Sequence, residues 1–283
     1  MAGHQGRLMS SAVQATSNVG NIRKIDFLMS PERDFPRREA GASYRYVLCS
    51  TPRSGSNLIG DMLHATQLAG DPQEYLNTRY IAGFMRSLGD GTRQMPVEQY
   101  MAQLEKRRSS ANGVFGIKIH YEHIAAQWPK RLGQAMRFLR QFDQFVLLTR
   151  RDKVAQAVSL HKARQSQIWS SLDYKFMPED DPRRTAVVEY DARRIMRALS
   201  DLVDQEEAWR VALNHLAKPF VEIAYEDVVA DYVGESHKLL RVLGIDPAQA
   251  SVTAPNIRKQ GADNDPMIAR FKAMLGVAAD HPA

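Results

Sequence analysis

Four short apolar runs along the chain have the length and composition of buried β-strands. They span residues 45–50, 114–119, 145–149 and 220–225. The run at 145–149 is the most apolar, and like the first it leads directly into polar residues and a helical pattern. Runs of this kind, bounded by polar turns, predict strands that are covered on both faces of a sheet.

Between these runs the apolar residues recur with helical spacing. Leu58, Ile59, Met62 and Leu63 share one face of a helix that follows the first strand. Further helices are predicted over 152–167, 184–215, 231–243 and 264–275. Strands that alternate with helices predict an α/β fold, a parallel β-sheet flanked by helices on both faces. In such a sheet ligands bind beyond the carboxyl ends of the strands.

The first 43 residues differ from the rest of the chain. They are rich in Gln, Ser, Asn and Gly, and they carry a charged stretch at 31–39. We expect an N-terminal arm over residues 1–43, flexible or separately packed, and one domain over residues 44–283. The arm lacks the apolar core of a secretory signal, and no run of about 18 apolar residues follows it. We therefore expect a cytoplasmic protein without a transmembrane segment.

Composition narrows the choice of ligand. The chain has 38 Lys and Arg against 32 Asp and Glu, and the net charge of +6 suits a polyanionic ligand. The basic residues are scattered among acids without interleaved aromatics, so we expect no nucleic-acid partner. The single Cys49 lies within the first strand and excludes a disulfide framework or a Cys-rich zinc site. No His/Asp cluster has metal-ligand spacing, so we expect no metal.

The loop after the first strand, residues 51–57, has the composition of an anion cradle. A turn glycine before a helix exposes successive backbone N–H groups, and the helix dipole adds positive potential. Serine, asparagine and arginine side chains add further donors. The candidate ligand-binding residues are Arg53, Ser54, Gly55, Ser56 and Asn57. The alternative interpretation is a helix N-cap formed by Ser and Asn. The loop lacks the second glycine and the Lys-Ser or Lys-Thr pair of a Walker A motif, which argues against a kinase that uses Mg-ATP.

A second junction follows the third predicted strand. Arg151 stands at the helix entry, and Ser159 follows eight positions later. At 3.6 residues per turn both side chains face one side of the helix, so they are able to hold one anion together. The alternative is a basic residue near a helix start with no partner in common.

Together the two junctions resemble the sulfotransferases that use 3′-phosphoadenosine-5′-phosphosulfate (PAPS), and in particular the bacterial trehalose 2-sulfotransferase family. The matching segments are 52–57, 71–75, 113–118, 156–159 and 205–210, and the likeness runs from about Tyr44 to Phe271. The resemblance implies the P-loop-like sulfotransferase fold and a homodimer. It also implies that the first loop binds the 5′-phosphosulfate and that Arg151 and Ser159 bind the 3′-phosphate. The product of the donor is then 3′,5′-bisphosphoadenosine (PAP).

The same resemblance assigns roles to single residues. Glu74 matches the family's proposed base, for which burial would have to raise the pKa. Arg53 and Lys118 match groups on the leaving-group side, and the late basic pair Arg258 and Lys259 matches a loop that binds the 3′-phosphate. The further candidates for binding the acceptor are Asp71, Gln73, His120 and Trp169.

Residues 120–123 depart from the family, which has a Met-Trp-Asn-Gln type stretch where this chain has His-Tyr-Glu-His. His120 and His123 are therefore alternative bases. The predicted reaction is sulfuryl transfer to a hydroxyl of trehalose, a glycolipid or a related saccharide. A nucleotide kinase with a degenerate P-loop and a non-enzymatic nucleotide-binding module are the two rival functions.

Overall fold

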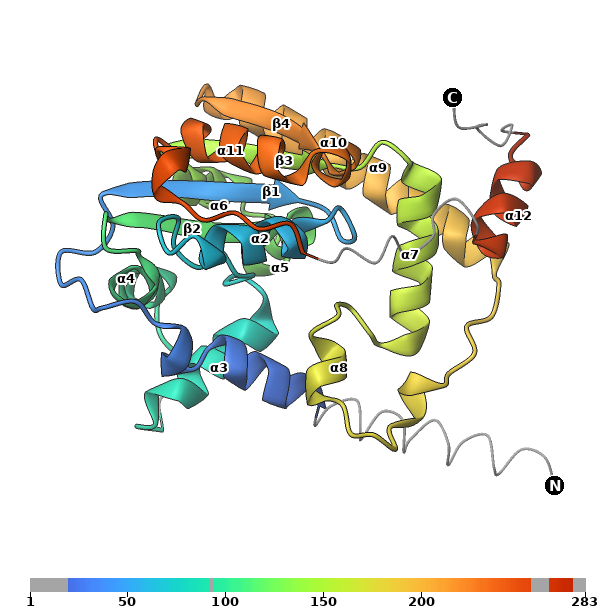
Figure 1. Cartoon of the computed structure of the whole chain (residues 1–283), viewed down its shortest axis with the longest axis horizontal. Helices are drawn as coiled ribbons and strands as arrows, with labels where there is room; N and C mark the ends of the chain where they lie inside the picture. Colours follow the sequence, from blue (N-terminus) through green and yellow to red (C-terminus); the bar gives the residue numbers. More distant parts are fainter. Residues whose placement is uncertain (1–19, 92–93, 256–264, 277–283) are drawn as a thin grey trace.

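The computed structural model describes residues 20–91, 94–255 and 265–276, and its centre is a parallel sheet with strand order β2-β1-β3-β4 (Figure 1). The strands are β1 (Tyr44–Ser50), β2 (Val114–His120), β3 (Gln144–Thr149) and β4 (Phe220–Ala224). All three pairings are parallel. Each strand agrees with its predicted range to within one residue at either end, so the prediction of a parallel α/β sheet is confirmed.

Helices cover both faces of the sheet, as predicted. The helices on one face are α2 (Ser56–Ala65), α10 (Tyr225–Ala230) and α11 (Tyr232–Val242). The helices on the other are α5 (Tyr121–Gln127), α6 (Leu132–Leu139) and α9 (Ala192–Leu216). The side chains of β1 divide between the two cores, because successive residues of a strand point to opposite faces. Tyr46 and Leu48 pack in the first core, and Val47 and Cys49 pack in the second.

The helix α7 (Lys153–Ser166) crosses beyond the carboxyl ends of the strands (Figure 1). It packs with the first half of α9 and with α12 (Pro266–Met274) in a third apolar cluster. The predicted helix over 184–215 begins later than expected, at Ala192. The reason is that Asp191 caps it by accepting the backbone N–H of Arg194, while residues 182–184 form a separate 3₁₀ turn.

The remaining elements flank the sheet on the side of β2. They are α3 (Thr78–Leu88), α4 (Val97–Arg108), α8 (Asp173–Phe176) and the short 3₁₀ turns η1 (Pro31–Arg33) and η2 (Pro182–Arg184). The 3₁₀ turn η3 (Pro247–Gln249) instead lies against α11. Residues 20–28 are helical, and Ile25, Leu28 and Met29 are buried in the same core as β1. The described part of the expected N-terminal arm is therefore packed into the domain and shares its core.

One buried carboxylate joins this N-terminal segment to the sheet. Asp71 is fully buried, and its oxygen atoms accept two hydrogen bonds from Arg33, at 2.6 and 3.0 Å, and one from Arg108 at 2.6 Å. Gln73 donates another at 3.0 Å. Burial alone raises the pKa of Asp71, but the two guanidinium groups outweigh it and hold the pKa below its ordinary value.

We predict that Asp71→Ala destabilises the protein by about 3–5 kcal/mol, because Arg33 and Arg108 would stay buried without their carboxylate. The free energy of unfolding in urea measures the loss. The matched control is Glu39→Ala, which removes an exposed carboxylate that also contacts two cations, Arg37 and Lys106. The control should leave the unfolding midpoint nearly unchanged. Equal losses in the two variants would contradict the structural role of Asp71.

Candidate active site

The loop after β1 lies at the carboxyl end of the sheet and leads into the N-terminus of α2, as the sequence predicted. Gly55 has φ +84°, and a Cβ atom there would lie 2.4 Å from the ring of Tyr225. The first residue of α10 therefore packs directly on the loop. The hydroxyl of Ser54 is buried and has no hydrogen-bond partner among the described residues. A buried hydroxyl without a partner is costly unless a ligand or water satisfies it.

Arg53 turns its side chain into the protein. Its Nε donates to Ser159 Oγ at 2.9 Å, and a terminal nitrogen donates to the carbonyl of Trp169. Arg150 lies beside it, because its terminal nitrogen is 3.4 Å from the Arg53 carbonyl oxygen and its guanidinium lies 4.8 Å from the centre of the Tyr225 ring.

Neither guanidinium has a carboxylate within 4 Å in the described part of the chain. Burial lowers the pKa of Arg53, and the charge of Arg150 lowers it further. The Nε atom of Arg150 is buried and also lacks a partner among the described residues. Asp173 partly offsets the charge of Arg53 from farther away, but the carboxyl end of the sheet still holds an excess of positive charge, which favours an anionic ligand.

The predicted clamp of Arg151 and Ser159 has a different arrangement. Ser159 accepts from Arg53, whereas Arg151 is exposed and directs both terminal nitrogens at Asp227, at 2.8 and 2.7 Å. The cause is the acidic first turn of α10, where Glu226 also accepts the backbone N–H of Arg151. The structure therefore brings Ser159 to the first loop and leaves Arg151 on a carboxylate. Arg258 and Lys259 lie outside the described residues.

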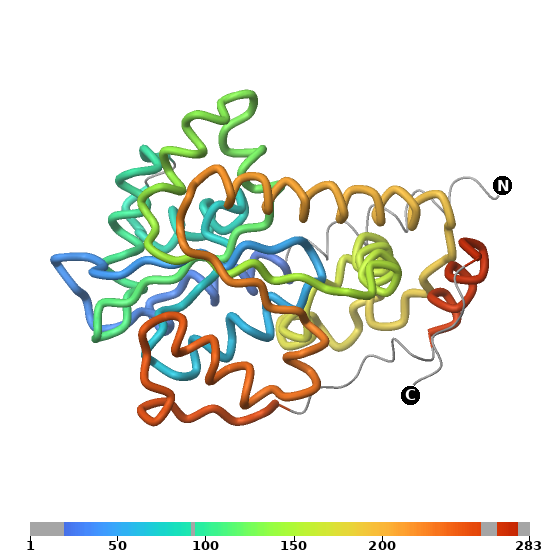
Figure 2. The backbone as a smooth tube through the Cα atoms, turned by 90° about the horizontal axis from the view of Figure 1, so that it is seen from above, coloured from blue at the N-terminus to red at the C-terminus, as the bar shows by residue number. Residues whose placement is uncertain are grey.

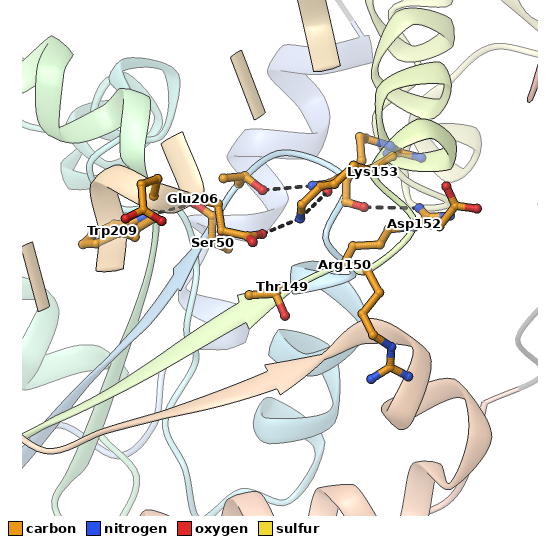
Figure 3. A network of polar contacts seen from close by, with 12 residues as sticks. Ser50, Thr149, Arg150, Asp152, Lys153, Glu206 and Trp209 are labelled. Atoms are coloured by element: carbon orange, nitrogen blue, oxygen red, sulfur yellow. Dashed lines mark hydrogen bonds and ion pairs between the residues drawn. The ribbon is translucent and has the colours of Figure 1, made fainter. Parts of the chain in front are cut away.

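A buried amide on α7 braces the first loop. Gln156 donates from Nε2 to Thr51 Oγ1 at 2.9 Å and to the Pro52 carbonyl at 2.8 Å. Lys153 donates to the side-chain oxygen Oε1 of Gln156 at 3.2 Å and forms an ion pair with Glu206. The side chain of Arg150 points away from this network (Figure 3).

The long helix α9 contributes Glu206 and Trp209 to the same brace. Trp209 is fully buried and donates from its indole nitrogen to the Ser50 carbonyl at 3.0 Å, at the end of β1. Sequence reasoning assigned no role to Gln156 or Glu206, although both lie in segments that resemble the family. Gln156 and Glu206 are each a polar residue on the apolar face of a helix. This pattern in the sequence was the indication that their side chains are buried and have polar partners.

A second polar cluster forms around Glu74. The carbonyl of Gln73 accepts the backbone N–H of Lys118 at 3.0 Å, so the loop before α3 joins β2 as a short parallel bridge. This bridge places the Glu74 carboxylate 3.4 Å from Lys118 Nζ. Lys118 is buried and also donates to the Asn57 side chain, at the start of α2. The cluster therefore contacts the first loop through Lys118 and Asn57.

Two histidines complete the cluster. His120 Nε2 lies 3.4 Å from Glu74 Oε1, and its Nδ1 lies 2.9 Å from Ser50 Oγ. His123 Nδ1 accepts the backbone N–H of His120 at 3.3 Å, which leaves its Nε2 to carry the proton in the neutral ring. That Nε2 is 3.8 Å from Glu74 Oε2. Three of the four ring nitrogens thus have a partner within 3.4 Å, and His123 Nε2 lies farther from Glu74.

The charges around Glu74 set its pKa. Burial raises the pKa of Glu74, but the charge of Lys118 and the charge and hydrogen bond of His120 outweigh burial and hold the pKa well below its usual range. This lowering of the pKa is opposite to the rise that the sequence prediction required of a base. The prediction considered the burial of Glu74 alone and did not include the cations that are buried beside it. Burial also lowers the pKa of His123, to about 4, so this ring is neutral at pH 7.

Three predicted acceptor-binding residues lie elsewhere than expected. Asp71 and Gln73 are buried in the ion-pair cluster with Arg33 and Arg108, where their polar atoms hold the fold together. Trp169 packs against the cluster of α7, α9 and α12, and its carbonyl accepts from Arg53. Its position is therefore beside the first loop. Of the acceptor candidates, His120 is the one that joins the Glu74 cluster.

Within the residues that the structure describes, no group of three or more His, Cys, Asp or Glu side chains is arranged to hold a metal ion. In the same part of the chain, every helix is too short or too polar to span a membrane.

We predict that Gly55→Ala weakens the binding of PAP by at least about tenfold, because the new Cβ would collide with the Tyr225 ring and displace the loop. Equilibrium dialysis with radiolabelled PAP measures the affinity. Gly89→Ala is the matched control, since Gly89 also has a positive φ (+70°) but its Cβ would meet nothing within 4 Å. The control should bind PAP normally. Full affinity in Gly55→Ala would show that the loop does not contact this ligand.

A second prediction concerns pH. The unfolded chain protonates His123 near pH 6.5, whereas the folded protein does so near pH 4, so stability falls as the pH drops between these values. His123→Gln removes this component. Between pH 7 and 5 the parent should lose about 2 kcal/mol more unfolding free energy than the variant, as measured in urea. Equal losses would show that His123 is not buried as a neutral ring.

Comparison of the sequence with known proteins identifies the family of this chain. A model of the Stf0 sulphotransferase family matches residues 45–274. The trehalose 2-sulfotransferase of Mycobacterium tuberculosis is 29% identical over 260 residues, which cover 81% of this chain and 94% of the relative. The enzyme of the same name from Mycolicibacterium smegmatis is 27% identical over 236 residues, covering 72% of this chain and 86% of the relative.

A solved sulfotransferase from Alicyclobacillus acidocaldarius aligns with a TM-score of 0.44 and 14% identity, over 84% of this chain and 97% of that one. The family match spans the whole sheet, the first loop, the Glu74 cluster and α7. The chain is therefore a transferase of the Stf0 sulphotransferase family.

Proposed function

We propose that this protein transfers the sulfuryl group of PAPS to a hydroxyl group of a carbohydrate and releases PAP. The observation that carries the proposal is the pair of guanidinium groups of Arg53 and Arg150 beside the first loop, neither of which has a described carboxylate within 4 Å. A ligand with several negative charges supplies the missing partner. The Glu74 and Lys118 pair nearby offers a carboxylate and an ammonium group for the transfer itself.

The residues around the loop fit the donor. The unpartnered Ser54 hydroxyl and the N-terminus of α2 suit the oxygens of a phosphosulfate. Ser56, Asn57 and Gly55 line the same helix start. We assign Ser159, Arg151, Arg258 and Lys259 to the 3′-phosphate. Arg151 would exchange the carboxylate of Asp227 for this phosphate, which retains its charge-assisted hydrogen bonds.

The chemistry of the donor is that of an activated sulfate. The protein must neutralise the oxygen that leaves and remove a proton from the acceptor hydroxyl. Arg53 and Lys118 provide the positive charge, and Glu74 takes the proton. When Lys118 turns from Glu74 toward the leaving oxygen, the cation that lowers the pKa of Glu74 moves away. The carboxylate then becomes a stronger base at the moment at which the reaction needs it.

The geometry favours Glu74 over the histidines as the base. Each ring nitrogen of His120 and His123 already faces Ser50, the backbone or Glu74, whereas the ionised Glu74 carboxylate has acceptor lone pairs beyond its present contacts. A base needs an atom that faces the proton it removes. The two histidines therefore hold the carboxylate in place rather than replace it.

We take the acceptor to be trehalose or a saccharide related to it, because the names of two relatives over most of this chain give trehalose. His120 and His123 stand where the family has other residues. We therefore expect this protein to differ from its relatives in the hydroxyl that it sulfates and in the group that the saccharide carries. We further propose a cytoplasmic homodimer, as the family resemblance implies.

One measurement separates this proposal from its two rivals. A thermal-shift comparison of PAP, Mg-ATP and single-stranded DNA should show stabilisation by PAP alone. A ligand at 100 times its dissociation constant adds about 2.7 kcal/mol of stability. A response to Mg-ATP alone would favour a kinase. A response to single-stranded DNA, or PAP binding without any turnover, would favour a binding module.

We predict that Glu74→Gln lowers the turnover of sulfuryl transfer from radiolabelled PAPS to trehalose by at least about 100-fold, because general-base catalysis is lost. The affinity for PAP should stay the same, since the donor does not contact the Glu74 carboxylate. Glu122→Gln is the control, because Glu122 is an exposed carboxylate on the neighbouring helix α5. Turnover of Glu74→Gln within threefold of the control would remove Glu74 from the role of base.

A further inference from the structure

The hairpin formed by α5 and α6 has an unusual distribution of charge. Residues 123–142 contain no Asp or Glu. Four cations, Lys130, Arg131, Arg137 and Arg140, lie in this stretch, and all four are exposed. None of them forms an ion pair with a carboxylate in the described ranges. On the rest of the surface many cations are paired with acids. The hairpin therefore forms a local surface of positive charge.

The same hairpin also exposes apolar groups. Leu132, the first residue of α6, has 64% of its surface exposed. Beside it lies an open hollow of about 270 Å³, lined by Tyr121 and Trp128 and by the side chains of Lys130 and Arg131. Trp128 packs on Phe138 at 4.9 Å between ring centres and remains half-buried. An aliphatic side chain and an apolar hollow between cations are what an interfacial surface requires.

The arrangement of α6 explains why the cations face outward. Its core side is filled by Ala135, Met136, Phe138 and Leu139, which are all buried. Arg137 and Arg140 lie on the opposite side of this short amphipathic helix, and Leu132 stands at its exposed start. Figure 2 shows the hairpin in green, where it projects from the edge of the molecule. A projecting basic and apolar edge is able to reach a flat surface without obstruction from the rest of the fold.

We propose that the α5–α6 hairpin docks this protein on a bilayer that contains anionic lipids. The four unpaired cations contact the headgroups, Leu132 enters the interface, and the hollow beside Trp128 receives part of an acyl chain. Nucleic acid fits this surface less well, because the Trp128 ring packs on Phe138 and the exposed apolar side chain, Leu132, is aliphatic.

The docking surface is connected to the candidate active site. The helix α5 begins directly after His120, whose ring contacts Glu74. The docking surface and the Glu74 cluster therefore lie at the two ends of the short helix α5. This step rests on the proposed function, and it adds the saccharide headgroup of a glycolipid to the acceptor class, beside free trehalose.

Vesicle co-sedimentation of the full-length protein tests the docking. The protein should bind vesicles of phosphatidylcholine with phosphatidylglycerol, should bind pure phosphatidylcholine vesicles much less, and should be released by high salt. Each cation near an anionic surface contributes about fivefold to partitioning, so Lys130→Gln/Arg131→Gln should bind roughly 30-fold more weakly. Leu132→Ser should also weaken binding, with a smaller dependence on salt.

The matched control is Arg193→Gln/Arg197→Gln, which removes the same charge from the exposed surface of α9. The control should sediment with anionic vesicles like the parent. Equal binding by the parent and the hairpin variant, equal binding to neutral vesicles, or tighter binding to single-stranded DNA than to anionic vesicles would each overturn the proposal. Vesicle binding needs no donor, and dialysis with PAP on the same variants reports the donor site, so the two proposals can fail separately.

Discussion

Buried positive charge at the carboxyl end of the sheet is the constraint on which the rest of the site depends. Two pairs of arginines in this molecule are buried in different ways. Arg33 and Arg108 surround the carboxylate of Asp71 and hold the N-terminal segment against the domain. Arg53 and Arg150 are close together, and no described carboxylate lies within 4 Å of either guanidinium, although Asp173 partly offsets the charge of Arg53 from farther away. The first arrangement is complete within the protein, and the second is not.

The residues around Arg53 and Arg150 hold this second, incomplete arrangement in place. Gln156 fixes the backbone of the first loop from α7, and Trp209 fixes the end of β1 from α9. Tyr225 lies between Gly55 and the guanidinium of Arg150. Every strand of the sheet contributes to the site through the residues that follow it or end it. Parallel strands bring such residues together, although they lie far apart in the sequence.

Sequence reasoning recovered the features that depend on local patterns. The four strands are short apolar runs, and the first loop is marked by a glycine between a strand and a helix. The family resemblance also named Glu74 and Lys118, which the structure brings to within 3.4 Å of each other. Contacts between residues that lie far apart in the sequence could not be predicted. The sequence does not indicate that Asp71 is surrounded by Arg33 and Arg108, that Asp227 binds Arg151, or that Lys118 lowers the pKa of Glu74. Helices α3, α4, α5 and α6 were also not predicted, although α3 buries Tyr80, Phe84 and Met85 at helical spacing.

Calorimetric titration with PAP tests the central claim most directly when it is performed on the parent protein and on Arg53→Met. The account predicts that the variant binds PAP at least about tenfold more weakly, because a charge-assisted hydrogen bond is lost. It also predicts that the ligand-free variant is at least as stable to urea as the parent, because a buried unpaired cation is removed. Unchanged PAP affinity in the variant, or an absence of PAP binding in the parent, would contradict the claim that this buried charge exists to bind the donor.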